Sequence, residues 1–323
     1  MLRVLLVGII GAFLAWGGYW FFGSRAVERE ATAWIAATPE ASVESLRVRG
    51  FPNRFDLTLT QPVYDTPDLA WSAPFAQVFA LSYKPNHVLV VFPHDQSLRV
   101  LGADWMLNSS DMRASLVARA SSEIGLDRAN LVIEALRARG VSGDSLRADK
   151  VRLASRALDD DPHAHEIGAE VLGLRPPPGF LAQVDPNGAL PPVIERVHLD
   201  GVVRFGRPLD RAAGSDARIE ALDLRGLTID WGAVSLNAEG ALQVDGAGQV
   251  AGDVSVTLAN WRLLLDGLRA AGLWDPGMDP LILGLLGGLA REDGDETTLT
   301  LPLTAQGGTL YLGPFALGRL PVL

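Results

Sequence analysis

The chain has 323 residues, of which 48% are hydrophobic and 20% are charged, a composition that excludes a disordered or collagen-like protein. Its formal net charge of -10 argues against a nucleic-acid partner, because contacts to phosphates need a basic surface. Cysteine is absent, which excludes disulfides, thiolate zinc sites, iron–sulfur clusters and a cysteine nucleophile.

An uncharged apolar stretch runs from Val4 to Phe22. As a helix it is long enough to cross a hydrocarbon core of roughly 30 Å, and Trp16, Tyr19 and Trp20 crowd its far end, as in an interfacial aromatic belt. We therefore predict a transmembrane anchor over residues 1–23 and a helical extension over 24–39, which Pro39 ends.

The competing interpretation of this stretch is a cleaved signal peptide. The only matching small-residue site, Ala31-Thr32-Ala33, lies beyond a charged segment, which favours an uncleaved anchor. The numbers of basic residues near the two ends of the apolar stretch are almost equal, so they decide little about its orientation in a membrane. We expect the N-terminus in the cytoplasm, because the short tail before the span cannot hold a domain and the rest must then be exported.

Alternating apolar and polar residues recur after the anchor and predict strands with one apolar face. Strands are expected at residues 54–60, 75–83 and 87–92, with a turn at 84–86 between the last two. Between residues 95 and 158 further segments are candidate strands, of which some could be short helices. The clearest pattern predicts a hairpin from Val234 to Leu258, turning at 246–248, and a final strand pair covers 299–303 and 309–315.

The sequence therefore predicts a mainly β (α+β) fold, an N-terminal transmembrane helix followed by antiparallel sheet with packed amphipathic helices. Helices are expected near 260–272 and 278–291. A segment rich in proline and turn residues, 175–192, separates a β-rich half at 40–174 from a second at 193–323, or is only a long crossover.

The densest polar cluster spans residues 159–166 and contains Asp161, His163 and His165. Two imidazoles two residues apart on an extended chain could share a side as metal ligands, whereas an acidic, solvated turn is the simpler interpretation. No nucleophile, zinc, phosphate-loop or dinucleotide motif occurs in the chain, so we predict no catalytic residues and no cofactor.

The sequence also has an excess of aliphatic side chains that no catalytic or metal-binding motif accompanies. One parity of the predicted hairpin forms a candidate apolar ligand face, made of Val234, Leu236, Leu242, Val244, Val254 and Val256. Such a face is either an open groove for membrane lipid or an ordinary filled core.

Several segments resemble an uncharacterised family of envelope proteins, best represented in alphaproteobacteria and known as domain of unknown function 2125. They are the anchor with its helix, the runs GFPNRFDL at 50–57 and YKPNHV at 83–88, and the block at 222–252. The closing segments, at 301–303, 307–314 and 320–321, are similar to the ends of AsmA-like proteins.

The AsmA resemblance implies a bacterial inner-membrane anchor and a curved periplasmic sheet with an apolar groove, serving phospholipid movement and envelope integrity. This chain is much shorter than the members that bridge two membranes, so a full span is not expected. Two alternatives remain: a non-enzymatic scaffold that binds other envelope proteins, and a metal-dependent hydrolase.

Overall fold

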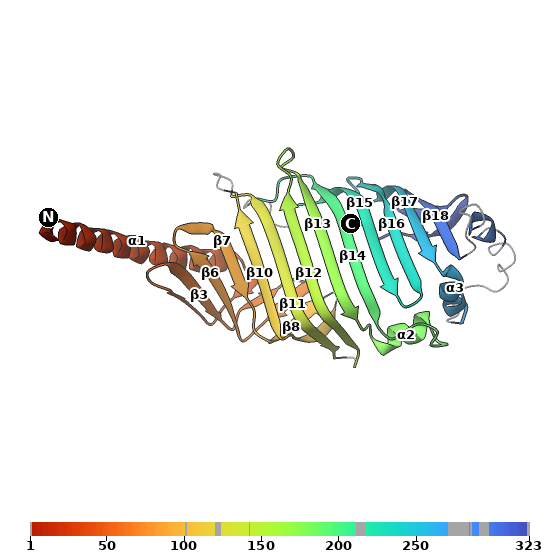
Figure 1. Cartoon of the computed structure of the whole chain (residues 1–323), viewed down its shortest axis with the longest axis horizontal. Helices are drawn as coiled ribbons and strands as arrows, with labels where there is room; N and C mark the ends of the chain where they lie inside the picture. Colours follow the sequence, from red (N-terminus) through yellow and green to blue (C-terminus); the bar gives the residue numbers. More distant parts are fainter. Residues whose placement is uncertain are drawn as a thin grey trace.

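The computed structural model describes residues 2–100, 102–119, 124–141, 143–210, 217–270, 284, 286–290 and 297–321. One long helix, α1 (Leu2–Ala37), leads into an antiparallel sheet whose strands stack side by side away from it (Figure 1). The sheet is curled but does not close. The predicted fold class, an apolar N-terminal helix followed by a mainly antiparallel sheet, is confirmed.

Helix α1 is continuous through the predicted anchor and its predicted extension. Residues 6–37 form a described helix that is long and apolar enough to cross a membrane. The helix ends just before Pro39, which cannot extend it because it lacks a backbone N–H. The structure is thus consistent with a single-pass anchor.

The body of the sheet is a meander in which each strand pairs with the next along the chain. Its strands are β10 (Asp111–Ala118), β11 (Leu126–Gly140), β12 (Ser145–Ala157), β13 (Ala164–Leu174), β14 (Ile194–Phe205), β15 (Ile219–Trp231), β16 (Val234–Val244), β17 (Val250–Ala259), β18 (Thr298–Gln306), β19 (Thr309–Leu312) and β20 (Phe315–Arg319). The predicted hairpin is β16 and β17. The candidate segments between residues 95 and 158 are strands in the part described.

The N-terminal part of the sheet is forked, because one edge of β11 pairs with both β10 and β9. The upper arm continues from β10 through β7 (Lys84–Val91), β6 (Phe75–Leu81) and β3 (Arg54–Thr60) to β2 (Ser45–Arg49). The lower arm runs through β9 (Ala103–Asn108), β8 (Asp95–Val100), β5 (Leu69–Ser72) and β4 (Val63–Asp65) to β1 (Ala41–Ser42).

The chain passes from one arm to the other at corners that interrupt its strands. Gln61, with a φ of 45°, precedes Pro62 at one corner, while Pro74 and Pro93 lie at two others. Proline suits these positions because it has no N–H to contribute to a ladder. The predicted turn at 84–86 is wrong, since β7 already begins at Lys84. Pro85 is tolerated there because pairing with β10 begins only at His87.

Short helical segments lie against the second half of the sheet. The crossover at 175–192 contains α2 (Pro178–Val184), and the strands that flank it, β13 and β14, pair directly. Helix α3 (Trp261–Ala270) matches the prediction near 260–272, of which 271–272 lie outside the described residues. Of the helix predicted at 278–291, residues 284 and 286–290 are described and are helical.

Helix α3 covers a well-packed end of the sheet. Leu299 of β18 is only 1% exposed and packs in one cluster with Trp261, Leu265, Leu286 and Ala290. We expect Leu299→Ala to lower the free energy of unfolding by about 2–5 kcal/mol, because it leaves a cavity in this cluster. Leu317→Ala is the matched control at an exposed position of β20 and should change it by less than about 0.5 kcal/mol.

Both variants would be compared with the parent as full chains in detergent, by chemical denaturation. Equal losses for the two substitutions would contradict the placement of Leu299.

Candidate ligand-binding face

The register of the sheet brings aliphatic side chains from distant parts of the chain into one row. Directly paired residues of antiparallel strands point to the same side of a sheet. Successive direct pairs from β2 to β18 form a row without a polar side chain, which we call the inner row. Its members are Val48, Leu57, Val78, Val90, Ala114, Leu131, Leu153, Ala169, Leu199, Leu227, Ala238, Val256 and Leu301.

Two further rows flank the inner row on the same side of the sheet, which we call the inner face. One contains Phe55, Val88 and Leu116 of the upper arm and Val254 and Leu303 near the far end. The other runs from Met112 and Ile133 to Leu236, Leu258 and Leu299. The inner face is therefore aliphatic over most of the length of the sheet.

The opposite, outer face is polar and carries linked ion pairs. Glu170 accepts from Arg152 at 2.7 Å and lies 3.6 Å from Arg196, so three adjacent strands share one charge network. Glu166 pairs in the same way with Arg156 and Arg225, whose hydrogen bonds lower the pKa of its carboxyl group. Exposed ion pairs of this kind contribute about 0–1 kcal/mol each to stability. Their main consequence is that the outer face is polar, in contrast to the inner face.

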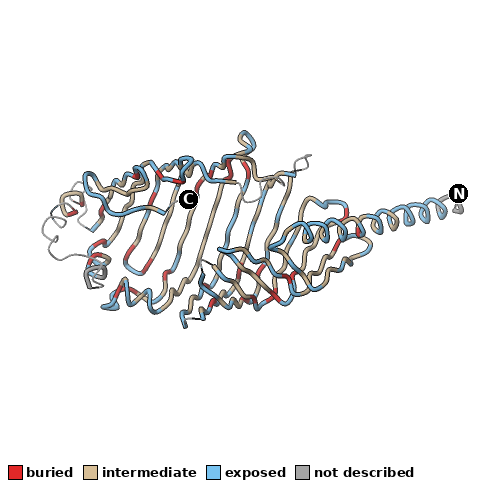
Figure 2. Tube along the Cα trace, turned by 180° about the vertical axis from the view of Figure 1, so that it is seen from behind, coloured by how far each residue is buried: buried red, intermediate tan, exposed pale blue. Residues whose placement is uncertain are grey.

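The inner face is uncovered in the middle of the sheet and covered at its far end. Leu153 in the inner row is 43% exposed, and most positions of the long central strands are intermediate or exposed (Figure 2). Farther along, Leu181 and Val184 of α2 pack near Trp231 and Val234, and α3 packs on Leu299. A large aliphatic surface therefore faces solvent between the first strands and these helices.

A hollow of about 650 Å³ opens at the rim of the inner face, between β7 and β11. Its walls are mostly apolar and include Val88, Leu116, Ile124, Leu126 and Leu209. Leu209 comes from the loop after β14, and its carbonyl accepts from the Leu126 amide at 2.7 Å, which fixes this wall. The size and lining of the hollow suit an apolar ligand.

Two buried polar side chains on this side of the sheet, His165 and Gln96, have polar partners. His165 is 1% exposed, its Nδ1 lies 3.0 Å from Ser155 Oγ, and its ring meets Phe205 edge to face. Burial lowers the His165 pKa, and the positive charge of Arg119 lowers it further. At the corner between the arms, buried Gln96 accepts from Trp71 Nε1 at 2.9 Å and donates to the Pro93 carbonyl.

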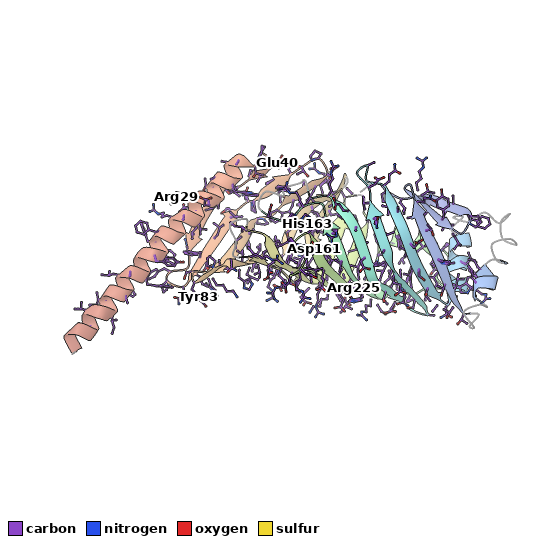
Figure 3. The ribbon with its side chains drawn as sticks, turned by 90° about the horizontal axis from the view of Figure 1, so that it is seen from above. Arg29, Glu40, Tyr83, Asp161, His163 and Arg225 are labelled. Carbon is purple, nitrogen blue, oxygen red and sulfur yellow. The ribbon has the colours of Figure 1, made fainter. Side chains whose placement is uncertain are left out.

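The candidate metal ligands do not converge. His165 is turned into the inner face, whereas the His163 ring lies 3.2 Å from the Phe205 carbonyl and Asp161 pairs with Arg204. Figure 3 shows Asp161 and His163 near the middle of the molecule. Among the residues that the structure describes, no group of three histidine, aspartate or glutamate side chains could hold a metal ion.

The six candidate ligand-facing residues all lie on the inner face. Leu236, Val254 and Val256 belong to its three rows, and Leu242 and Val244 follow on β16. Val234 packs in the cluster beneath α2, so it is covered by the protein itself. The sequence did not predict the rim hollow. Each of its strands shows alternating apolar and polar residues, but only the pairing of β7, β10 and β11 brings the lining residues together.

The chain belongs to a family described as uncharacterized protein conserved in bacteria (DUF2125), whose model matches residues 20–321. The predicted resemblance to this family is confirmed, while the AsmA-like features and the alphaproteobacterial origin stay predictions. Comparisons with curated proteins and with solved structures each gave no match. The description of the family names no activity.

Buried His165 gives the stability of the protein a defined pH dependence. Its pKa in the folded state lies below the ordinary value of 6.5, so the unfolded chain binds the proton first as the pH falls. As the pH falls through the ordinary value of 6.5, protonation of the unfolded chain at this group should lower the free energy of unfolding, by at most about 1.4 kcal/mol per pH unit.

The measurement is chemical denaturation of the full chain in detergent at several pH values. His165→Gln keeps a polar side chain beside Ser155 and should flatten the dependence, because other titrating groups are unchanged. An identical slope in the variant and the parent would contradict the assignment.

Proposed function

We propose that this protein is anchored in the bacterial inner membrane by α1 and binds phospholipid acyl chains along its periplasmic inner face, in envelope lipid handling. The observation that supports the proposal is the inner row, which stays aliphatic from β2 to β18 and is uncovered around Leu153. Soluble proteins rarely expose an apolar surface of this extent unless it has a binding partner.

An acyl chain fits this surface better than a compact ligand does. The inner row is long and narrow, and no group of side chains that could hold a metal ion accompanies it among the described residues. Each methylene that leaves water for an apolar surface contributes about 0.8 kcal/mol. A lipid that leaves a bilayer forfeits this energy for every methylene, and a continuous aliphatic row restores most of it.

The same transfer energies favour exchange of lipid between the bilayer and the inner face over tight binding. Because the bilayer is as apolar as the inner face, transfer between the two is close to balanced once the ordering of the chain on the sheet is included. The curled sheet does not close, so a charged headgroup can stay in water while the acyl chain lies inside. We therefore propose binding with little headgroup selectivity.

The proposal predicts lipid contact on the inner face only. A photo-crosslinking residue in place of Leu116, on the inner face, should capture phospholipid in cells, whereas the same residue in place of Leu89 should not. Leu89 is matched because it is similarly exposed, at 38%, but its partners Phe79 and Ser115 place it on the outer face.

A charge in the inner row should block this capture. With the crosslinker at Leu116, Leu153→Asp should reduce the lipid adduct about tenfold or more, because a carboxylate beside an acyl chain costs at least about 1.4 kcal/mol. Leu89→Asp is the control and should leave the adduct unchanged. Equal adducts from Leu116 and Leu89, or an adduct insensitive to Leu153→Asp, would contradict lipid binding on this face and favour a scaffold.

The orientation of the anchor can be measured separately. An alkaline phosphatase fused after Leu323 is active only where the fusion is exported, so the proposed topology predicts high activity. A cytoplasmic fluorescent reporter at the same position should be dark, and the opposite pair of signals would contradict a periplasmic sheet.

A further inference from the structure

The C-terminal half of the apolar segment of α1 is held by two turns of the sheet. Trp16 Nε1 donates to the Pro52 carbonyl at 2.9 Å, and Trp20 Nε1 donates to the Arg54 carbonyl at 2.7 Å. Between them Tyr19 Oη donates to the carbonyl of Ser82 at 2.6 Å. The β2–β3 turn at residues 50–53 and the β6–β7 turn at 82–83 therefore have a fixed height along the helix.

Aromatic contacts extend this attachment deeper along α1. The Phe51 ring meets Trp20 edge to face at 5.4 Å and Phe13 at 6.3 Å. Phe13 lies well inside the uncharged stretch that ends at Phe22. At 1.5 Å per residue, the hydrogen bond to Trp16 makes the β2–β3 turn overlap the end of the apolar segment by roughly 9 Å, at the level of the predicted aromatic belt, and the Phe51 ring reaches deeper.

A turn that overlaps a membrane span by this much cannot lie wholly in bulk water. We propose that the β2–β3 and β6–β7 turns lie in the headgroup region of the bilayer that holds α1, where Phe51 and Tyr83 form a second membrane contact. This inference rests on the proposed anchor and names the part of the sheet that meets the lipid.

The side chains at the two turns suit this location. Phe51 is exposed in spite of its ring contacts, and Tyr83 is 67% exposed beside the helix (Figure 3). Tyrosine and tryptophan favour the headgroup level, because one end of the ring is apolar and the other forms hydrogen bonds. Lys84, next to Tyr83, is exposed and adds a positive charge that attracts anionic headgroups.

The contact also joins the anchor to the inner face. Phe55 of β3 lies on the inner face, and its ring stacks with Trp20 at 6.2 Å. Gly23 allows this close approach, since a Cβ there would lie 2.7 Å from the Phe55 ring. Apolar surface thus continues from α1 through Trp20 and Phe55 to the first strands, and the inner face begins at the height of the headgroups.

The depth of the turns can be measured because the chain has no cysteine. Single variants Asn53→Cys, Tyr83→Cys, Leu14→Cys and Leu317→Cys of the full chain would carry a polarity-sensitive fluorophore. They would be reconstituted in phosphatidylethanolamine–phosphatidylglycerol vesicles with a nitroxide near the headgroup end of the acyl chains. Leu14 reports on the anchor, and exposed Leu317 in β20 reports on the far end of the sheet.

We expect the blue shifts at Asn53 and Tyr83 to lie between those at Leu14 and at Leu317. Their loss of emission should be at least as large as that at Leu14, because the nitroxide lies at their depth, and larger than that at Leu317. Strong quenching at Leu14 with Asn53 and Tyr83 indistinguishable from Leu317 would overturn the second membrane contact and leave the anchor intact. Absence of quenching at Leu14 would overturn the anchor and this inference together.

Discussion

The register of antiparallel pairing is the constraint on which the rest of the structure depends. A slip of one residue would turn every aliphatic side chain of a strand to the wet face. The pairing avoids this from Val48 at one end of the inner row to Leu301 at the other. Because the aliphatic residues lie in line, the protein has one long apolar surface, which α2 and α3 cover at its far end. The linked ion pairs of the outer face fit the same register.

Two backbone irregularities keep the aliphatic side chains on the inner face at points where regular alternation along a strand would turn them to the outer face. In β15 the apolar parity changes between Leu224 and Leu227, and a bulge at this point keeps both on the inner face. Figure 3 labels Arg225, which takes the extra position and pairs with Glu166. In β11 the buried positions change parity between Ile133 and Ala138, across Ala135, whose φ of 51° is rare outside glycine.

These features explain how far the sequence could predict the molecule. The long apolar helix α1 and the β16–β17 hairpin follow from local patterns, an uncharged run and a strict alternation. The fork at β11 and the corners depend on pairing between residues far apart, such as Arg137 with Asn108, which no local pattern reveals. His163 and His165 looked equivalent in the sequence, but β13 begins between them and directs only His165 into the inner face.

The central claim is that the inner face is a lipid surface and not an incompletely packed core. An experimental density map of the full chain in phospholipid nanodiscs would test it most directly. We expect elongated density within about 4–4.5 Å of Leu131 and Leu153, continuous toward Phe55 and the bilayer. A map in which the sheet closes and its own side chains fill the space over Leu153 would contradict it.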